Sequence, residues 1–143
     1  MQFLQGSVTN STDASKLTDA INHLDNALLS RNWLDDLHPV PGTRGEKVFS
    51  EEKAATARLK ELRNTNHSGI SVFEFQHHID GVVRGNREVP NVAIGEAIER
   101  SGIQSKINSA MSELRKGDAE AMKDHPDKAI DHYKNSWKYA LSS

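Results

Sequence analysis

The chain has 143 residues and a mass of 15.9 kDa, which is the size of one ordinary domain. It carries 18 basic and 20 acidic residues, and this balance argues against a protein that binds nucleic acid through charge. No apolar run approaches the length of about 18 residues that a membrane-spanning helix needs. The absence of cysteine excludes disulfides, thiolate metal sites and cysteine nucleophiles.

The N-terminal part of the chain is predicted to be a flexible lead over residues 1–12, followed by a single helical domain over residues 13–143. The lead lacks the basic start and the apolar core of a signal peptide, so two interpretations stay open. Either the protein remains inside the cell, or the chain is a mature or trimmed form. From Asp13 onward apolar residues recur at helical spacing, with Thr12 or Asp13 as the expected N-cap. This first stripe consists of Leu17, Ala20, Ile21, Leu24, Ala27 and Leu28.

The second helix is expected after an irregular segment at residues 38–46, where two prolines and a glycine break the helical pattern. Ser50 is the predicted N-cap, because two acidic residues follow it in the first turn. The helix is expected to end in the polar residues 64–69. Its apolar stripe is narrow and consists of Ala54, Ala55, Leu59 and Leu62.

The third helix is predicted to begin near Ile70 or Ser71, although its β-branched residues leave a strand over 70–75 as the alternative. Pro90 either kinks one long helix that runs to Arg100 or lies in the first turn of a new helix. Two further helices follow, the last beginning near Pro126. Its predicted buried face consists of Ala129, Ile130, Tyr133, Trp137, Ala140 and Leu141.

These segments predict an all-α protein, an up-and-down bundle of four to six helices without a β-hairpin. No catalytic motif such as G-x-S-x-G or H-E-x-x-H occurs, and the glycines form no phosphate loop. We therefore expect a protein that is not an enzyme and that holds no cofactor.

The histidines are the residues that favour an alternative function, a metal-binding bundle. Asp124-His125 and Asp131-His132 recur seven residues apart, which would place both rings on one helix face. A neutral imidazole backed by a carboxylate is a common ligand of zinc or copper. Adjacent rings such as His77 and His78 point about 100° apart on a helix, and the spacing His-x3-His is absent. The favoured interpretation is solvated surface histidines, and the candidate metal ligands are His23, His77, His78, His125 and His132.

The C-terminal segment carries a resemblance to a known module. Lys116-Gly117-Asp118 and the run from Pro126 to Ala140 resemble the closing motif of the FIMAH-like helical modules of predicted secreted and surface proteins in archaea and bacteria. Gly45–Ala54, preceded by Trp33-Leu34, is similar to an upstream motif of the same modules, and the stretch from Asn86 to Ala97 resembles one of their helices. Asn86, Pro90 and Ser136 depart from the usual pattern. The resemblance covers about residues 13–141.

The resemblance implies a non-catalytic, extracellular or cell-surface helical module that serves structure, adhesion or protein contact, and it implies no ligand residue. We therefore expect a structural or interaction module that acts through a protein partner or self-association, with no nucleic acid and no transmembrane segment. Two alternatives stay open, a histidine-based metal-binding bundle and a cytoplasmic helical protein that acts through a protein partner.

Overall fold

The computed structural model describes residues 11–65 and 70–143. Within these residues it contains five α-helices, which are α2 (Ser11–Ala27), α3 (Thr43–Thr65), α4 (Val72–Glu99), α5 (Gln104–Met122) and α6 (Pro126–Leu141). This arrangement confirms the predicted all-α bundle of four to six helices. Residues 1–10 of the predicted lead lie outside the described residues, and the remaining two, Ser11 and Thr12, belong to α2.

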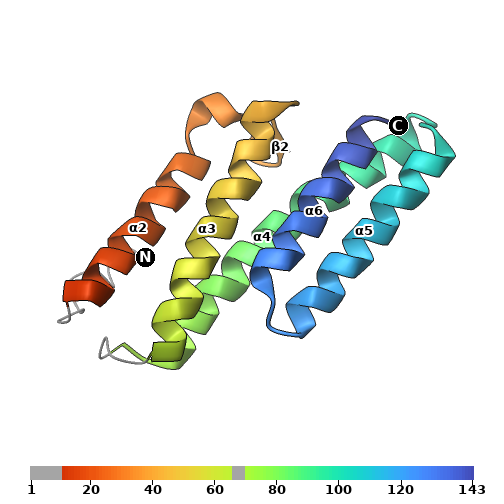
Figure 1. Cartoon of the computed structure of the whole chain (residues 1–143). Helices are drawn as coiled ribbons and strands as arrows, with labels where there is room; N and C mark the ends of the chain where they lie inside the picture. The colour runs from red at the N-terminus through yellow and green to blue at the C-terminus, as the bar shows by residue number, and fades with distance from the viewer. Residues whose placement is uncertain (1–10, 66–69) are drawn as a thin grey trace.

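The helices lie roughly in two layers (Figure 1). Helices α2, α3, α6 and α5 lie side by side, and α4 runs behind them. Helix α2 packs mainly on α3, whereas α4 packs on α3, α5 and α6. None of the described helices is both long enough and apolar enough to span a membrane.

Two clusters of buried side chains hold these helices together. The N-terminal core lies between α2, α3 and the first half of α4, and the C-terminal core lies between α3, the second half of α4, α5 and α6. Val83 of α4 packs against both. The N-terminal core consists of Leu17, Ala20, Ile21, Leu59, Leu62, Ile70, Phe75 and Ile79. The C-terminal core consists of Phe49, Val89, Ala93, Ile94, Ala110, Leu114, Ala129, Ile130, Tyr133, Trp137 and Ala140.

Helix α3 begins at Thr43, so the prediction that Ser50 is its N-cap is wrong. Ser50 lies inside the helix, where its hydroxyl donates to the carbonyl of Glu46 at 3.2 Å. Gly45 lies in this helix where no larger residue fits: a Cβ added there would collide with the Val40 carbonyl oxygen and would lie 2.5 Å from the Trp137 ring. A close approach of two helices therefore explains a glycine that the sequence pattern assigned to an irregular segment.

Helix α4 is continuous from Val72 to Glu99. The alternative of a strand over 70–75 is therefore wrong, and so is the alternative of a new helix starting at Pro90. Ser71 is the N-cap, and its side chain accepts a hydrogen bond from the backbone N–H of Phe73 at 3.2 Å. Pro90 is fully buried inside the helix, where packing of the surrounding side chains compensates for the lost N–H.

The connection from α2 to α3 corrects the prediction that the chain has no hairpin. After the 3-10 helix η1 (Ser30–Asn32), strand β1 (Trp33–Asp35) pairs antiparallel with β2 (His38–Pro39). The Asp35 carboxylate closes the turn, because it accepts hydrogen bonds from the backbone N–H groups of Leu37 at 2.9 Å and His38 at 3.1 Å. The hairpin replaces part of the irregular segment predicted at residues 38–46.

Two leucines that the sequence placed on buried helix faces are exposed in the structure. Leu28 is 68% exposed because α2 ends at Ala27, one residue before it. Leu141 is 41% exposed and is the last residue of α6. The other five predicted residues of the α6 face are buried.

Candidate functional site

A pocket of about 330 Å³ opens between the α2–α3 connection and α4. Leu28, Trp33 and Leu37 of the connection form one wall, and Gly85 and Val89 of α4 form the other. The indole of Trp33 is fixed in this wall because its Nε1–H donates to the carbonyl of Ala27 at 2.7 Å. The pocket therefore has apolar walls and one rigid aromatic side.

Glu52 of α3 supplies the most unusual polar group of this pocket. Its carboxylate accepts a hydrogen bond from the side-chain amide of Asn86, which is only 2% exposed. Among the described residues, nothing donates to the Asn86 Oδ1 atom. Burial raises the pKa of Glu52 to about 7, and the hydrogen bond from Asn86 offsets only part of this effect.

Two further acidic residues, Asp36 and Glu88, line the same pocket, and none of its described lining residues is Lys or Arg. The hairpin that carries Asp36 is attached to α4 through His38. The His38 ring contacts Asp35 at 2.6 Å and Glu96 of α4 at 2.7 Å. These two carboxylates raise the pKa of His38, the larger effect coming from Asp35.

Three other half-buried glutamates differ from Glu52, because each contacts a histidine ring or a lysine. Glu51 contacts His23 at 2.5 Å, and Glu120 contacts His125 at 2.7 Å. Glu113 lies 2.6 Å from His132 and 2.8 Å from Lys116. Burial opposes the ionisation of Glu113, but these two hydrogen bonds outweigh it and lower its pKa. In the described part of the chain, no such ion pair involves Glu52.

Four exposed leucines lie in the α2–α3 connection, and two of them, Leu28 and Leu37, line the pocket. Leu28 and Leu34 are 68% and 67% exposed, and Leu29 and Leu37 are less exposed. We call these four residues the leucine surface. Single exposed apolar residues are ordinary, but a group of large ones in one short connection is typical of a contact surface.

The candidate histidines do not form a metal centre in the described residues, which contain no group of three or more metal-binding side chains placed to hold an ion. Helix α6 begins at Pro126, so His125 lies before it and the predicted shared helix face does not form. His125 and His132 pair with two different glutamates of α5, Glu120 and Glu113. His23 pairs with Glu51 across α2 and α3. These three rings bind α-helices to one another.

The adjacent pair His77 and His78 lies on α4 with ring centroids 5.7 Å apart and an interplanar angle of 65°. Burial lowers the pKa of His78, and the neighbouring His77 lowers it further. Neither ring lies in the pocket beside Glu52.

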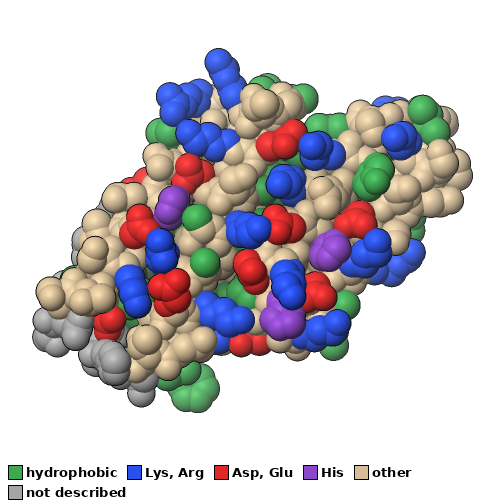
Figure 2. All heavy atoms as spheres, viewed as in Figure 1, with side chains coloured by type: hydrophobic (Ala, Val, Ile, Leu, Met, Phe, Trp, Pro, Cys, Tyr) green, Lys and Arg blue, Asp and Glu red, His purple; other side chains and the backbone are tan. Residues whose placement is uncertain are grey.

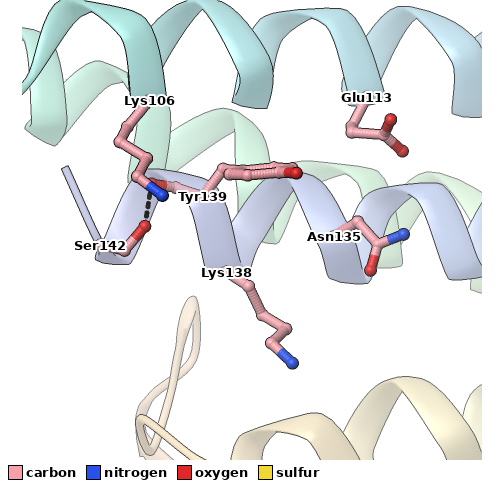
Figure 3. Close-up of a pocket in the computed structure, with 6 residues that line it drawn as sticks. All are labelled: Lys106, Glu113, Asn135, Lys138, Tyr139 and Ser142. Atoms are coloured by element: carbon pink, nitrogen blue, oxygen red, sulfur yellow. Dashed lines mark hydrogen bonds between the residues drawn. The ribbon is translucent and has the colours of Figure 1, made fainter.

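A second hollow, of about 450 Å³, lies between α5 and α6 (Figure 3). Its charged groups are already paired within the molecule. Lys106 lies 5.5 Å from the centre of the Tyr139 ring, and Lys138 lies 3.1 Å from Glu46. Figure 2 shows a similar mixture of positive and negative side chains over the face formed by α2, α3, α6 and α5. We therefore take the pocket beside Glu52 as the candidate site.

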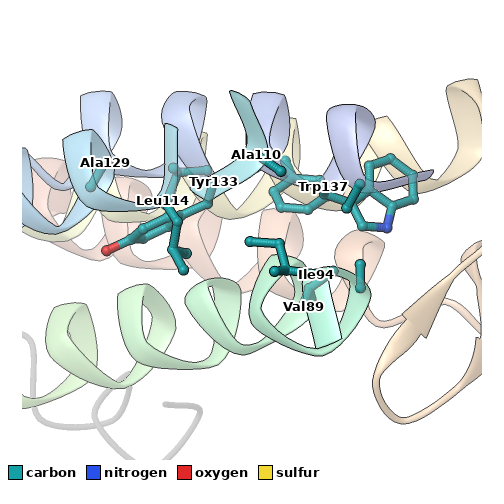
Figure 4. Packing of buried hydrophobic residues seen from close by; sticks show 11 residues of the cluster. Val89, Ile94, Ala110, Leu114, Ala129, Tyr133 and Trp137 are labelled. Atoms are coloured by element: carbon teal, nitrogen blue, oxygen red, sulfur yellow. The ribbon is translucent and has the colours of Figure 1, made fainter. Parts of the chain in front are cut away.

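The residues that carry the C-terminal motif form packing contacts (Figure 4). The Tyr133 ring lies so close to Gly117 that a Cβ added there would collide with two of its carbon atoms, Cε1 and Cδ1. The Tyr133 hydroxyl donates to Asp118 at 2.9 Å, and Arg87 of α4 donates to both oxygens of Asp118 at 2.7 and 2.9 Å. Arg87 lowers the pKa of Asp118, and Tyr133 adds to the effect although burial opposes it. The motif thus links α4, α5 and α6.

Comparisons of the chain with models of protein families, with curated proteins and with solved structures found no match. The site therefore has to be interpreted from its own geometry. Sequence reasoning missed Glu52, which it assigned only to a helix N-terminus. The signal was present, because Glu52 lies three residues after Phe49 and three before Ala55, on the buried face of α3.

Proposed function

We propose that the chain is a non-enzymatic interaction module that binds a protein partner through the leucine surface. The observation that carries the proposal is the group of large exposed side chains beside an open apolar pocket. Burying one leucine contributes about 1.5–3 kcal/mol to association, so a few such residues are enough for a specific contact. The resemblance of the C-terminal motif to FIMAH-like modules supports a secreted or cell-surface protein.

The partner that fits this surface is a basic, amphipathic segment of another protein. Asp36 and Glu88 line the pocket, and no described lining residue is positively charged. A symmetric contact between two copies of this chain would bring the acidic groups of both copies together, which is unfavourable. A segment that presents leucine-like and lysine side chains matches both the apolar walls and the acidic groups.

The test uses a synthetic amphipathic helix of leucine and lysine, with a leucine and glutamate version as the charge control. We expect the lysine peptide to bind, and the double variant Leu28→Ser with Leu34→Ser to lower its affinity by about tenfold or more. Both substitutions are at exposed positions and preserve the net charge. The matched control is Phe73→Ser with Met122→Ser, which removes two side chains that are 85% and 89% exposed elsewhere.

Three outcomes would contradict the proposal. The first is equal binding of the lysine peptide by both double variants. The second is equal binding of the glutamate peptide. The third is a dimer in light scattering that the leucine variant abolishes, because the leucine surface would then serve self-association.

A further inference from the structure

The pocket beside the leucine surface has the features of a receptor for one positively charged group. It combines apolar walls, one fixed indole ring and a half-buried carboxylate without a cationic partner among the described residues. We propose that this pocket receives an alkylammonium group, the lysine side chain of the partner segment, with Glu52 as its counter-ion. The inference rests on the proposed function, because the lysine is delivered by the segment that docks on the leucine surface.

The hydrogen-bonding inventory of the pocket supports an ammonium ligand. Glu52 lines the pocket with a carboxylate of two acceptor oxygens, and its one described hydrogen bond comes from the side-chain amide of the buried Asn86. The Oδ1 atom of Asn86 has no described donor although the side chain is 2% exposed. A partly buried carboxylate with a single described donor is costly, so a further donor that reaches Glu52 is favourable. An ammonium group brings three N–H donors and a positive charge.

The shape and the remaining charges of the pocket agree with a lysine side chain. Leu28, Leu37 and Val89 give apolar contact for a chain of methylene groups. Trp33 adds an aromatic ring, to which a cation is attracted. The other titratable groups that line the pocket are Asp36 and Glu88, and both are acidic.

The contrast with other glutamates shows why the ligand has to come from outside. Within the chain, Glu113 contacts Lys116 and His132, and Glu51 contacts His23. Glu52 is likewise half-buried but contacts an amide. A cation that enters the pocket would ionise Glu52 and form the missing pair, so its binding is expected to strengthen as pH rises through about 7.

The first experiment uses n-hexylamine as the probe, with n-hexanol as its neutral counterpart, and follows the indole N–H signals by NMR. Hexylamine is expected to shift the Trp33 signal but not that of Trp137, which lies in the C-terminal core. Binding at about pH 9 is expected to be several-fold tighter than at about pH 5, because the amine stays protonated at both while Glu52 ionises. Equal binding of hexanol and hexylamine would overturn the inference.

The decisive variant is Glu52→Gln, which keeps the size and the hydrogen bonding of the side chain and removes its charge. We expect it to lower hexylamine affinity about tenfold and to abolish the pH dependence. Glu51→Gln is the matched control, because Glu51 is adjacent, half-buried and directed at His23. Unchanged affinity in Glu52→Gln would refute the role of this carboxylate.

The leucine and lysine peptide separates this inference from the proposed function. If Glu52→Gln weakens the peptide as it weakens hexylamine, a lysine occupies the pocket as inferred. If the peptide binds through the leucine surface and its affinity is the same for Glu52→Gln as for the wild type, the proposed function stands and the inference fails. If hexylamine binds while the peptide does not, the pocket takes a free amine, which contradicts the proposed function and the assignment to a partner's lysine.

Discussion

Two regions that meet at the middle of α4, around Asn86 and Arg87, treat buried polar groups in opposite ways. In the C-terminal core, Asp118 accepts from Arg87 and Tyr133, so one carboxylate receives three hydrogen bonds from two neighbouring elements. Beside the hairpin, Glu52 receives one hydrogen bond from Asn86, and the Asn86 oxygen lacks a described donor. A satisfied network stabilises a fold, whereas a partly satisfied one lowers stability.

This difference separates the residues that stabilise the bundle from the residues that are available for binding. The C-terminal motif belongs to the first group, because its glycine, tyrosine and aspartate fill and link the C-terminal core. The pocket and the leucine surface belong to the second group. A resemblance based on packing residues therefore carries information about the fold and little about the ligand.

The largest expected effect comes from the C-terminal core. Trp137 is 2% exposed and packs on Phe49 with ring centroids 5.3 Å apart. Trp137→Ala is expected to lower the free energy of unfolding by about 3–5 kcal/mol, because it leaves a large cavity. Chemical denaturation monitored by circular dichroism measures this change. Leu34→Ala on the leucine surface is the control and is expected to change stability by less than about 0.5 kcal/mol. Similar losses in both variants would remove the distinction between the two regions.

The next effect has the opposite sign and lies in the pocket. The pKa of Glu52 is about 7 in the fold against an ordinary value of 4.5, so the folded state favours the protonated carboxyl. The free energy of unfolding is therefore highest, as far as Glu52 is concerned, below pH 4.5, where the carboxyl is protonated in both the folded and the unfolded state. This stability is lost as the pH rises through about 7. Glu52→Gln should therefore match the wild type at low pH and exceed its stability above pH 7 by about 2 kcal/mol, after allowing for partial solvent access.

Unfolding curves recorded across this pH range measure the difference. Glu51→Gln, which disrupts a contact with His23, is expected to give no such gain. A loss of stability in Glu52→Gln at high pH would show that the ionised carboxylate is stabilised by the fold. That result would contradict the contrast between Glu52 and the paired glutamates.

The smallest effect compares two helical glycines. Gly117→Ala is expected to cost about 1 kcal/mol, because overpacking against Tyr133 exceeds the gain in helix propensity. Gly81→Ala lies in open space on α4 and is expected to gain up to about 1 kcal/mol. Thermal unfolding of the two variants checks the opposite signs. A stabilised Gly117→Ala variant would mean that the Tyr133 ring moves aside without cost.

The sequence predicted the helices well where a periodic apolar face decides the structure. The buried face of α6 and the start of that helix at Pro126 are examples. Prediction was weaker where long-range contacts decide: Gly45 was placed in an irregular segment although it lies in α3 against Trp137, and two alternatives stayed open at Pro90, which lies inside α4. The site was missed for the same reason, since Glu52 and Asn86 meet only after α3 and α4 pack together.

The histidines show a second limit of prediction from sequence. The seven-residue spacing of His125 and His132 predicted one helix face, but α6 begins after His125, and the spacing could not reveal that Glu120 and Glu113 of α5 contact the two rings. Local spacing gives the face on which a side chain lies. The identity of its partner depends on the neighbouring helix.

The position of α4 between the two cores has a consequence for how the protein unfolds. Its first half belongs to the N-terminal core, its second half belongs to the C-terminal core, and Val83 contacts both. Melting either core would leave half of this helix without its packing, so the two halves are expected to unfold in one cooperative transition. Helix α2 lies at the edge of the bundle and packs mainly on α3. Its backbone amides are therefore expected to exchange with solvent before those of α4.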